Sequence, residues 1–404
     1  KRHEIEYFSY QATATACYYC ASPVVGAAMS SGSKIKRSSV YLTFKRLWRR
    51  MREHRKAVQL IVARRLWDKP PSQEVLDPSK VSRVAVLRWD DKLGDTLMAT
   101  LFVDALHKVR PDIEITYITG KQGKTLLHDW DAISELVIIE RRGWKTAHSL
   151  GGISAGFDVV VELTSGMSAY ELYALHRLKG NHYIGYDKHD YALFDVCVDD
   201  SERNFASRYL AAAALLTGKQ VVGEFYLPSA VAAEPLVANY LADKPAASKK
   251  VLINLFAAGK HRSFAMPDAE RFLRWWLDTW PAVQLMLLSV PGREEQLNQL
   301  VSVIDSPRLD RTPLPPSIEL TVALVKASDL VFSPDTALVH IVAALDCPQI
   351  AVYREQGDEY EAWRPASARA HVLFNRPAGG RYDRTVAADF SWPDLRNKVD
   401  ELLA

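Results

Sequence analysis

The sequence predicts an α/β fold of two doubly wound domains, each with a parallel sheet covered by helices on both faces. Short apolar runs bounded by turn residues alternate with longer stretches of helical periodicity, a pattern typical of parallel sheets with crossover helices. The alternation occurs in 81–228 and again in 250–404, on either side of a stretch rich in Ala, Pro and Lys. With 404 residues, 48% of them hydrophobic, the chain is long enough to bury two cores.

The first forty residues carry no periodic pattern, and we expect 1–40 to be disordered. Cys17 and Cys20 form a CxxC, but no second Cys or His pair follows at zinc spacing, so we interpret it as coincidental. Four cysteines in 404 residues are too few for a disulfide framework, which favours a reducing compartment and predicts a cytoplasmic protein.

A basic amphipathic helix is predicted for 41–70. Between Lys34 and Lys69 the chain has thirteen Lys or Arg against two acidic residues, whereas the remainder is mildly acidic. Apolar residues recur at helical spacing: Phe44, Leu47, Trp48, Met51, Val58, Ile61, Val62 and Leu66. One interpretation is an interfacial helix on anionic lipid; the other is a solvated helix that packs on the body through the same stripe. No apolar run is long enough to span a bilayer, and no motif indicates nucleic-acid binding.

The elements of the first domain follow in order. Buried-strand runs and helical stretches alternate: strand 84–87, helix 94–109, strands 113–118, 136–139 and 159–163, helices 168–179 and 204–217. The second domain repeats the pattern: strand 251–255, helix 268–279, strands 283–289 and 330–332, helix 337–345, strand 349–353. Ligands of such sheets bind at the carboxyl ends of the strands, so we expect a cleft between the two domains.

The turn after the first strand carries the first candidate site residues. Arg88, Asp91, Gly94 and Asp95 lie between the strand and the helix that follows. A carboxylate at Asp95 would sit at the mouth of the cleft, where it could accept a proton from an attacking hydroxyl. The alternative is a helix N-cap, for which Asp is favoured. The turn lacks both GxGxxG and a Gly-Lys-Ser/Thr sequence, so it is neither a dinucleotide fingerprint nor a P-loop.

A second turn, Ser333 to His340, precedes a helix in the second domain. Free N–H groups at a helix start form an anion site that suits a diphosphate, and His340 could donate a hydrogen bond to it. The alternative is an Asp or Thr cap with a core histidine. Lys260 and Arg262 follow the first strand of that domain, where two cations can stabilise a leaving phosphate.

Together these motifs resemble glycosyltransferase family 9, the ADP-heptose:lipopolysaccharide heptosyltransferases, over roughly Val81 to Pro365. The Arg-x-Asp-x-x-Gly-Asp-type opening is matched from Arg88 to Thr100, and the Ser-Pro-Asp-Thr-x-x-x-His signature from Ser333. The resemblance implies a GT-B fold, with two Rossmann-like domains facing a central cleft. It also implies an acceptor domain at 81–228, a nucleotide-sugar donor domain at 250–404, and no metal or cofactor.

The resemblance also implies roles for individual residues. Asp95 matches the catalytic base, and Arg88, Asp91 and Gly94 belong to the acceptor side. Asp335, Thr336, Ala337 and His340 match the donor loop, although Ala337 stands where Gly is common. Lys260 or Arg262 would contact the phosphates, and Glu294 or Glu295 the ribose of the nucleoside.

The function that the resemblance implies is inverting transfer of a heptose from ADP-heptose to the inner core of lipopolysaccharide, on a lipid A–Kdo or core heptose acceptor. The enzyme would be peripheral at the inner face of the inner membrane, contacting anionic lipid through 41–67. The alternatives are a GT-B transferase that uses another nucleotide sugar for a surface polysaccharide, and a non-catalytic nucleotide-sugar-binding protein.

Overall fold

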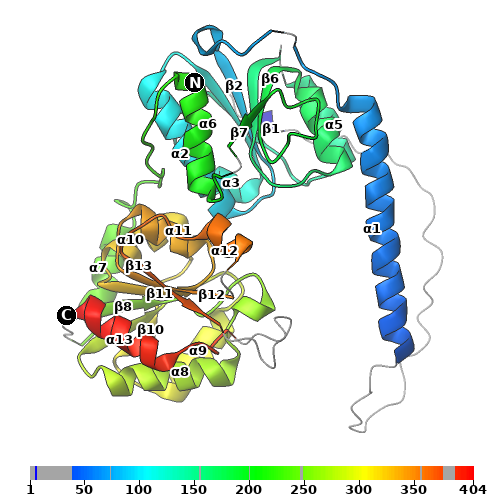
Figure 1. The fold of residues 1–404 in the computed structure, drawn as a ribbon. Helices are drawn as coiled ribbons and strands as arrows, with labels where there is room; N and C mark the ends of the chain where they lie inside the picture. Colours follow the sequence, from blue (N-terminus) through cyan, green and yellow to red (C-terminus); the bar gives the residue numbers. More distant parts are fainter. Residues whose placement is uncertain are drawn as a thin grey trace.

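A computed structural model describes residues 5–6, 39–72, 74–153, 156–199, 201–245, 249–354, 357–375 and 387–404, without the side chains of 5–6, 39–45 and 260. The chain forms two α/β halves, one above the other in Figure 1, with the long helix α1 at one side. In the described part of the chain, the halves contain a seven-stranded and a six-stranded sheet, both parallel throughout. The predicted fold class is confirmed.

The first sheet has the strand order β1-β4-β3-β2-β5-β6-β7. Its strands are β1 (Ile5–Glu6), β2 (Arg83–Arg88), β3 (Glu114–Thr119), β4 (Glu135–Ile138), β5 (Phe157–Glu162), β6 (Gly180–Tyr186) and β7 (Val196–Val198). The helices of this half are α2 (Leu93–Val109), α3 (Lys121–Leu127), α4 (Trp144–Ser149), α5 (Ala169–Leu178) and α6 (Phe205–Thr217), with short 3₁₀ turns at Pro78–Lys80 and Leu150–Gly152. From β2 the chain moves outward first through β3 and β4 and then, in the other direction, through β5 to β7. Strand order therefore reverses between β2 and β5, which opens a crevice at their carboxyl ends.

The second sheet repeats this topology, in the order β10-β9-β8-β11-β12-β13. Its strands are β8 (Lys249–Ile253), β9 (Val283–Leu287), β10 (Leu309–Arg311), β11 (Leu330–Pro334), β12 (Gln349–Tyr353) and β13 (Ala370–Phe374). Its helices are α7 (Glu234–Ala242), α8 (Met266–Thr279), α9 (Glu294–Ile304), α10 (Ile318–Lys326), α11 (Ala337–Ala344), α12 (Asp358–Trp363) and α13 (Trp392–Leu403), with a 3₁₀ turn at Lys260–Arg262. Here the strand order reverses between β8 and β11, so the second crevice lies at the ends of these two strands.

The elements that the sequence predicts form within about two residues of their expected bounds. Between its terminal arginines, strand β2 is a run of small and branched apolar residues that are all buried, as both faces of a covered parallel sheet require. Helix α5 begins with a capping box, because Ser168 accepts from the backbone N–H of Glu171 and Glu171 accepts from that of Ser168. Strand β6 is absent from the sequence prediction because it opens with Gly180, Asn181 and His182, which do not form an apolar run.

The segment 1–40, predicted to be disordered, lies almost entirely outside the described residues, as does the CxxC. Ile5–Glu6 forms the edge strand β1 beside β4.

Helix α1 (Ser39–Trp67) confirms the helix predicted for 41–70 but packs with a different face from the apolar stripe. Its carboxyl-terminal end lies on α5, with Ala63 fully buried and the Trp67 ring 4.5 Å from that of Tyr173. The stripe itself is exposed, for example by 58% at Met51 and 65% at Ile61. The alternative in which the stripe packs on the body is therefore wrong. Figure 1 shows that the amino-terminal end of α1 extends well beyond the first half.

The two halves meet through α2 and α11 and through α6 and α12. Leu97 of α2 and Ile341 of α11 belong to one continuous apolar cluster, which also includes residues under both sheets. The Phe205 and Trp363 rings lie 4.2 Å apart, and the Asn204 amide donates to backbone carbonyls of 361 and 364. The carboxyl ends of both sheets are thereby held facing one another.

Candidate active site

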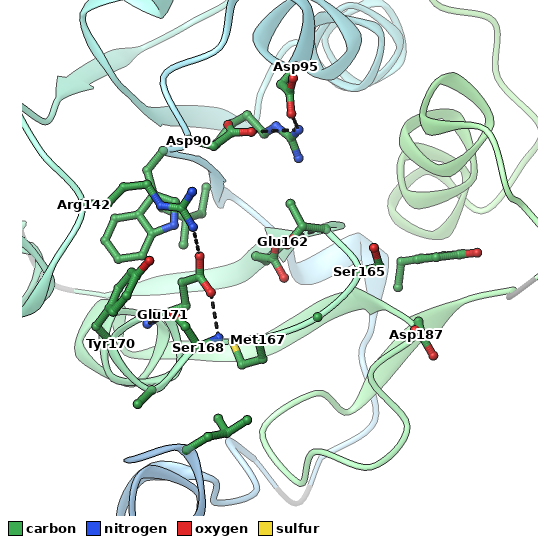
Figure 2. Close-up of a pocket in the computed structure, with 18 of the residues that line it drawn as sticks. Asp90, Asp95, Arg142, Glu162, Ser165, Met167, Ser168, Tyr170, Glu171 and Asp187 are labelled. Atoms are coloured by element: carbon green, nitrogen blue, oxygen red, sulfur yellow. Dashed lines mark hydrogen bonds and ion pairs between the residues drawn. The ribbon is translucent and has the colours of Figure 1, made fainter. Parts of the chain in front are cut away.

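A cavity of about 1330 Å³ lies at the carboxyl end of the first sheet, where the strand order reverses. Residues following β2, β5 and β6 line it, together with part of α1 and with α12 from the second half. Its depth comes from the sheet topology, because the loops after β2 and β5 leave in opposite directions. Figure 2 shows carboxylate, guanidinium and aromatic side chains converging on this space.

The base candidate Asp95 is held inside this cavity by an arginine from the preceding strand. Arg88 donates to the Asp95 carboxylate, and its Nη2 lies 3.2 Å from Oδ2 of Asp90 (Figure 2). Asp95 is 6% exposed and stands in the first turn of α2. The N-cap position belongs instead to Lys92, whose side chain makes no cap bond, so the structure does not use Asp95 as an N-cap. The carboxylate therefore lies at the cavity as the partner of Arg88 and not as a cap of α2.

Burial and charge give the two aspartates different proton affinities. Burial, with a hydrogen bond to Asp90, raises the pKa of Asp95 to about 7 despite the Arg88 guanidinium. Burial opposes ionisation of Asp90 as well, but the guanidinium of Arg88 outweighs it and lowers the pKa of Asp90 below its usual value. The pair therefore keeps one negative charge on Asp90, and Asp95 exchanges its proton near neutral pH, as a general base requires.

Buried polar atoms without a hydrogen-bond partner gather around the same cavity. Among the described residues that line it, they are Nε and Nη1 of Arg88, Oδ1 of Asp90, Oε2 of Glu162 and Nη1 of Arg208. Buried polar groups in proteins are nearly always paired, so a cluster of unpaired donors and acceptors at one cavity indicates a site for a polar ligand. Hydroxyl groups of a saccharide can both donate to and accept from this set.

Glu162 is fixed at the end of β5 by its neighbours. Its Oε1 accepts from the backbone N–H and the hydroxyl of Thr164, while Oε2 lies 3.7 Å from Nζ of the fully buried Lys188. Burial raises the pKa of Glu162 despite this ammonium group. Oε2 thus remains available to a ligand in the cavity.

Aromatic and cationic side chains form another wall. The guanidinium of Arg142 pairs with Glu171 and lies within 6.0 Å of the Trp89 and Tyr170 ring centres (Figure 2). Trp144, 42% exposed, packs edge-on against Tyr170 and also lines the cavity. Apolar ring faces beside charged groups suit a sugar, which has both C–H faces and hydroxyl edges.

At the matching position of the second sheet, the structure brings the predicted donor residues together. Arg262 donates to the Asp335 carboxylate at 2.7 Å and to its carbonyl at 3.1 Å. The Thr336 hydroxyl lies 3.0 Å from that of Ser333, and the Asn254 amide contacts both hydroxyls. Thr336 stands at the N-cap of α11 and makes no side-chain cap bond, so no such bond occupies the first N–H groups of this helix.

Ala337 and His340 face the first half rather than open solvent. A Cβ at Gly94 would lie 3.2 Å from Cδ2 of His340 and 3.5 Å from Cα of Ala337. His340 is buried, its Nδ1 has no hydrogen bond, and burial lowers its pKa to about 4. The imidazole is therefore neutral at physiological pH, which fits the core-histidine alternative and leaves Nδ1 as a neutral partner for a ligand.

The remaining predicted residues lie outside the cavity. Asp91 has a positive φ of 52° and accepts from the backbone N–H of Gln122, so it caps α3. Gly94 faces α11 and not the cavity. Glu294 accepts from the backbone N–H of Gly292 at the start of α9. Glu295 also lies in this first turn, and the side chain of Lys260 is outside the described set.

Sequence reasoning missed several residues that line the cavity: Asp90, Arg142, Trp144, Glu162, Tyr170, Asp187 and Arg208. Glu162 was detectable, because it stands at the carboxyl end of the predicted strand 159–163, whereas Asp187 follows β6, a strand that the sequence did not predict. The others come from loops and helices whose position depends on the folded chain.

The sequence and the fold both resemble those of known glycosyltransferases. Residues 154–385, more than half of the chain, match the family model described as glycosyltransferase family 9 (heptosyltransferase). The chain belongs to glycosyltransferase family 9. It is 24% identical over 316 residues to the "Putative lipopolysaccharide heptosyltransferase 4" of Escherichia coli (strain K12), covering 73% of this chain and 82% of that protein.

Solved structures share the fold. The family 9 glycosyltransferase of Veillonella parvula has a TM-score of 0.63 at 15% identity, covering 80% of this chain and 97% of its own. E. coli ADP-heptose lipopolysaccharide heptosyltransferase II has a TM-score of 0.58 at 18% identity, with coverage of 80% and 98%. E. coli heptosyltransferase WaaC with ADP has a TM-score of 0.56 at 15% identity, with coverage of 79% and 99%. These likenesses confirm the predicted GT-B architecture of this family 9 enzyme.

Two further findings concern the described residues of this glycosyltransferase. No helix among them has both the length and the apolar character needed to cross a bilayer. No group of three or more of their His, Cys, Asp and Glu side chains is arranged to hold a metal ion.

Proposed function

We propose that this glycosyltransferase transfers a heptose, with inversion, from ADP-heptose to the inner core of lipopolysaccharide. The curated relative is named as a lipopolysaccharide heptosyltransferase, and two solved structures of the same fold are titled as heptosyltransferases, one of them with ADP. A further title describes WaaC with ADP-2-deoxy-2-fluoro heptose. These names support both the nucleotide and the sugar of the proposed donor.

The observation that carries the proposal is the position of Asp95. Its carboxylate lines the large cavity of the first half, while its neighbour Gly94 contacts the first turn of α11 in the second half. The loop that carries the proposed base therefore lies against the amino-terminal end of α11, where the diphosphate is proposed to bind. An acceptor hydroxyl in the cavity and a donor on α11 would be within reach of each other, which is the main requirement for direct displacement.

In the proposed reaction Asp95 removes the proton of the acceptor hydroxyl as that oxygen attacks the anomeric carbon. The bond from this carbon to the diphosphate breaks, so ADP leaves with the electron pair and the configuration inverts. The negative charge developing on the diphosphate would be stabilised by the N–H groups of α11, by Arg262 and by Lys260. The proton stays on Asp95, and the proposed chemistry uses no metal or cofactor.

The cavity and the donor loop would divide the substrates between them. The unpaired atoms of Arg88, Glu162 and Arg208 would bind acceptor hydroxyls. Asp335, Thr336, Ala337 and His340 would surround the diphosphate and heptose, and Glu294 or Glu295 would contact the ribose. An anionic membrane surface at 41–67, on the inner face of the inner membrane, completes the proposed set of partners.

ADP release by the purified protein tests the proposal. With ADP-heptose and a lipid A–Kdo or core heptose acceptor, release should depend on the acceptor and be lost in Asp95→Ala, while calorimetry shows unchanged ADP affinity. Full activity of the variant would contradict the role of Asp95. Binding of another nucleotide sugar in place of ADP-heptose would favour a different GT-B transferase, and donor binding without transfer to any acceptor would favour a binding protein.

A further inference from the structure

Helix α1 is firmly attached at one end and along one side. Ala63 is buried, and the Trp67 ring packs at a tilt against Tyr173. Arg64 donates to the carbonyl of Asp190, and its guanidinium lies 4.5 Å from the Tyr191 ring centre. Asp68, just after the helix, accepts from the backbone N–H of Leu193 at 2.9 Å. These contacts fix the orientation of α1, so the directions in which its other sides point are set by the fold.

The side of α1 that turns away from the body is apolar and exposed. Successive residues of a helix advance by 100°, which places Leu47, Met51, Val58 and Ile61 opposite Ala63 and Trp67, and Leu66 at the border with the packed side. The exposed fractions are 54% at Leu47, 58% at Met51, 45% at Val58, 65% at Ile61, 50% at Val62 and 56% at Leu66. Exposed apolar side chains thus gather on one outward side in two groups, at 47–51 and at 58–66, and such a gathering marks an interaction surface, because isolated exposed apolar residues would be scattered.

The charge of α1 favours an anionic lipid surface over a second copy of the chain as the partner of this surface. The 29 residues of α1 contain nine Lys or Arg and one acidic residue, Glu53. Arg50 and Arg65 lie on the same outward side as these apolar residues, and both are exposed. A second copy of the chain would bring like charges together, whereas an anionic lipid surface gains about 1 kcal/mol for each cation near it and accepts the apolar side chains as well.

The inner side of the same helix forms part of the cavity. Arg55, Lys56, Gln59 and Leu60 line it, together with the loop that leads into α5. In Figure 1 the helix has its carboxyl-terminal end beside α5 of the first half and extends from there down to the level of the second half. The wall of the cavity and the apolar outward stripe thus belong to one helix, about 10 Å thick with its side chains.

We propose that α1 binds an anionic lipid bilayer through its outward stripe and thereby holds the mouth of the acceptor cavity at the membrane surface. A saccharide acceptor would then enter along the inner side of α1 while its lipid anchor stays in the bilayer. The proposal deepens the proposed function, because it assigns the membrane partner to one side of α1; the part concerning the acceptor rests on the proposed transfer reaction, whereas lipid binding by α1 is tested without it.

Vesicle sedimentation tests the lipid-binding part with the full chain. The wild type should bind vesicles of phosphatidylcholine with about a third phosphatidylglycerol, and bind pure phosphatidylcholine far less, because the attraction needs anionic headgroups. Replacing Met51, Ile61 and Leu66 by Ser should weaken binding at least about tenfold. A matched variant replaces three exposed valines elsewhere, Val75, Val222 and Val231, by Ser and should bind like the wild type.

Transfer assays test whether lipid binding by α1 promotes reaction with a membrane-anchored acceptor. The α1 variant should lose about tenfold of its rate on acceptor embedded in these vesicles, yet match the wild type on the deacylated, soluble acceptor. Equal vesicle binding by wild type and α1 variant would overturn the proposal. So would a wild-type dimer that the variant abolishes, since the stripe would then join two copies. Normal vesicle binding with no transfer to either acceptor would refute the proposed function and leave lipid docking standing.

Discussion

Gly94 of α2 and His340 of α11 lie so close that a Cβ at position 94 would be 3.2 Å from the His340 Cδ2 atom. This contact joins the loop that carries the proposed base to the helix that carries the proposed diphosphate site. Both residues belong to motifs recognisable in the sequence. The structure shows why they occur together: a hydrogen at position 94 lets the two helix ends approach.

Gly94→Val should therefore reduce turnover while leaving each half folded. The branched side chain forces α2 and α11 apart, and a displacement near 1 Å between reacting groups costs roughly a hundredfold in rate. The measurement is kcat for ADP release, with circular dichroism to check folding. Gly357→Val is the matched control, since a Cβ there meets no atom within 4 Å. Unchanged kcat in Gly94→Val would show that the contact does not position the site.

The pH dependence of kcat/KM should reveal the paired aspartates. Since Asp95 acts as a base only when ionised and its pKa is about 7, kcat/KM should fall about tenfold per unit below that pH and level off above it. Asp90→Asn removes a contribution that raises this pKa, so the acidic limb should move to lower pH. Asp187→Asn, another carboxylate of the cavity, serves as control and should leave the limb in place. If the acidic limb of the kcat/KM profile does not move in Asp90→Asn, the titration of a group other than Asp95 causes that limb.

The fold could be predicted from sequence because its signals are local. Runs such as Val84 to Leu87 and the helical stretch after Gly94 identify their elements without knowledge of the partner strands. Strand β10, only three residues long, and the 3₁₀ turn at 260–262 depend on packing and gave no such signal.

The site was predictable only in part, for a physical reason. Asp95, Asp335 and His340 stand at strand or helix ends, where position along the chain implies position at the cleft. The Arg88–Asp90 ion pair and the wall provided by α1 arise from contacts between side chains and between distant elements. Motif spacing also suggested that Asp91 faces the acceptor, whereas its positive φ turns it toward α3.

Arg88→Met should destabilise the protein strongly and in a pH-dependent way. Removing the guanidinium leaves Asp90 and Asp95 without their buried cation, with the largely exposed Lys92 still 4.0 Å from Asp95, and breaking a buried ion pair in this way costs about 3–5 kcal/mol. Without Arg88 both carboxyl pKa values should rise above their unfolded values, so protonation relieves the penalty and stability should increase as pH falls from 8 to about 6. Urea unfolding of variant and wild type at several pH values measures this. A loss independent of pH would indicate missing packing of the arginine side chain instead.

His340 should make the native state sensitive to acid. Burial holds its pKa at about 4, below the ordinary value of 6.5, so the unfolded chain binds this proton first as pH falls. The resulting contribution to the free energy of unfolding is complete above pH 6.5, declines by about 3 kcal/mol as pH falls toward 4, and then stays constant. His340→Gln should remove this part of the decline, whereas His148→Gln, on an exposed position of α4, should retain it. Parallel pH profiles for wild type and His340→Gln would mean that the imidazole gains solvent or an anionic partner in solution, because only then would its pKa match that of the unfolded chain.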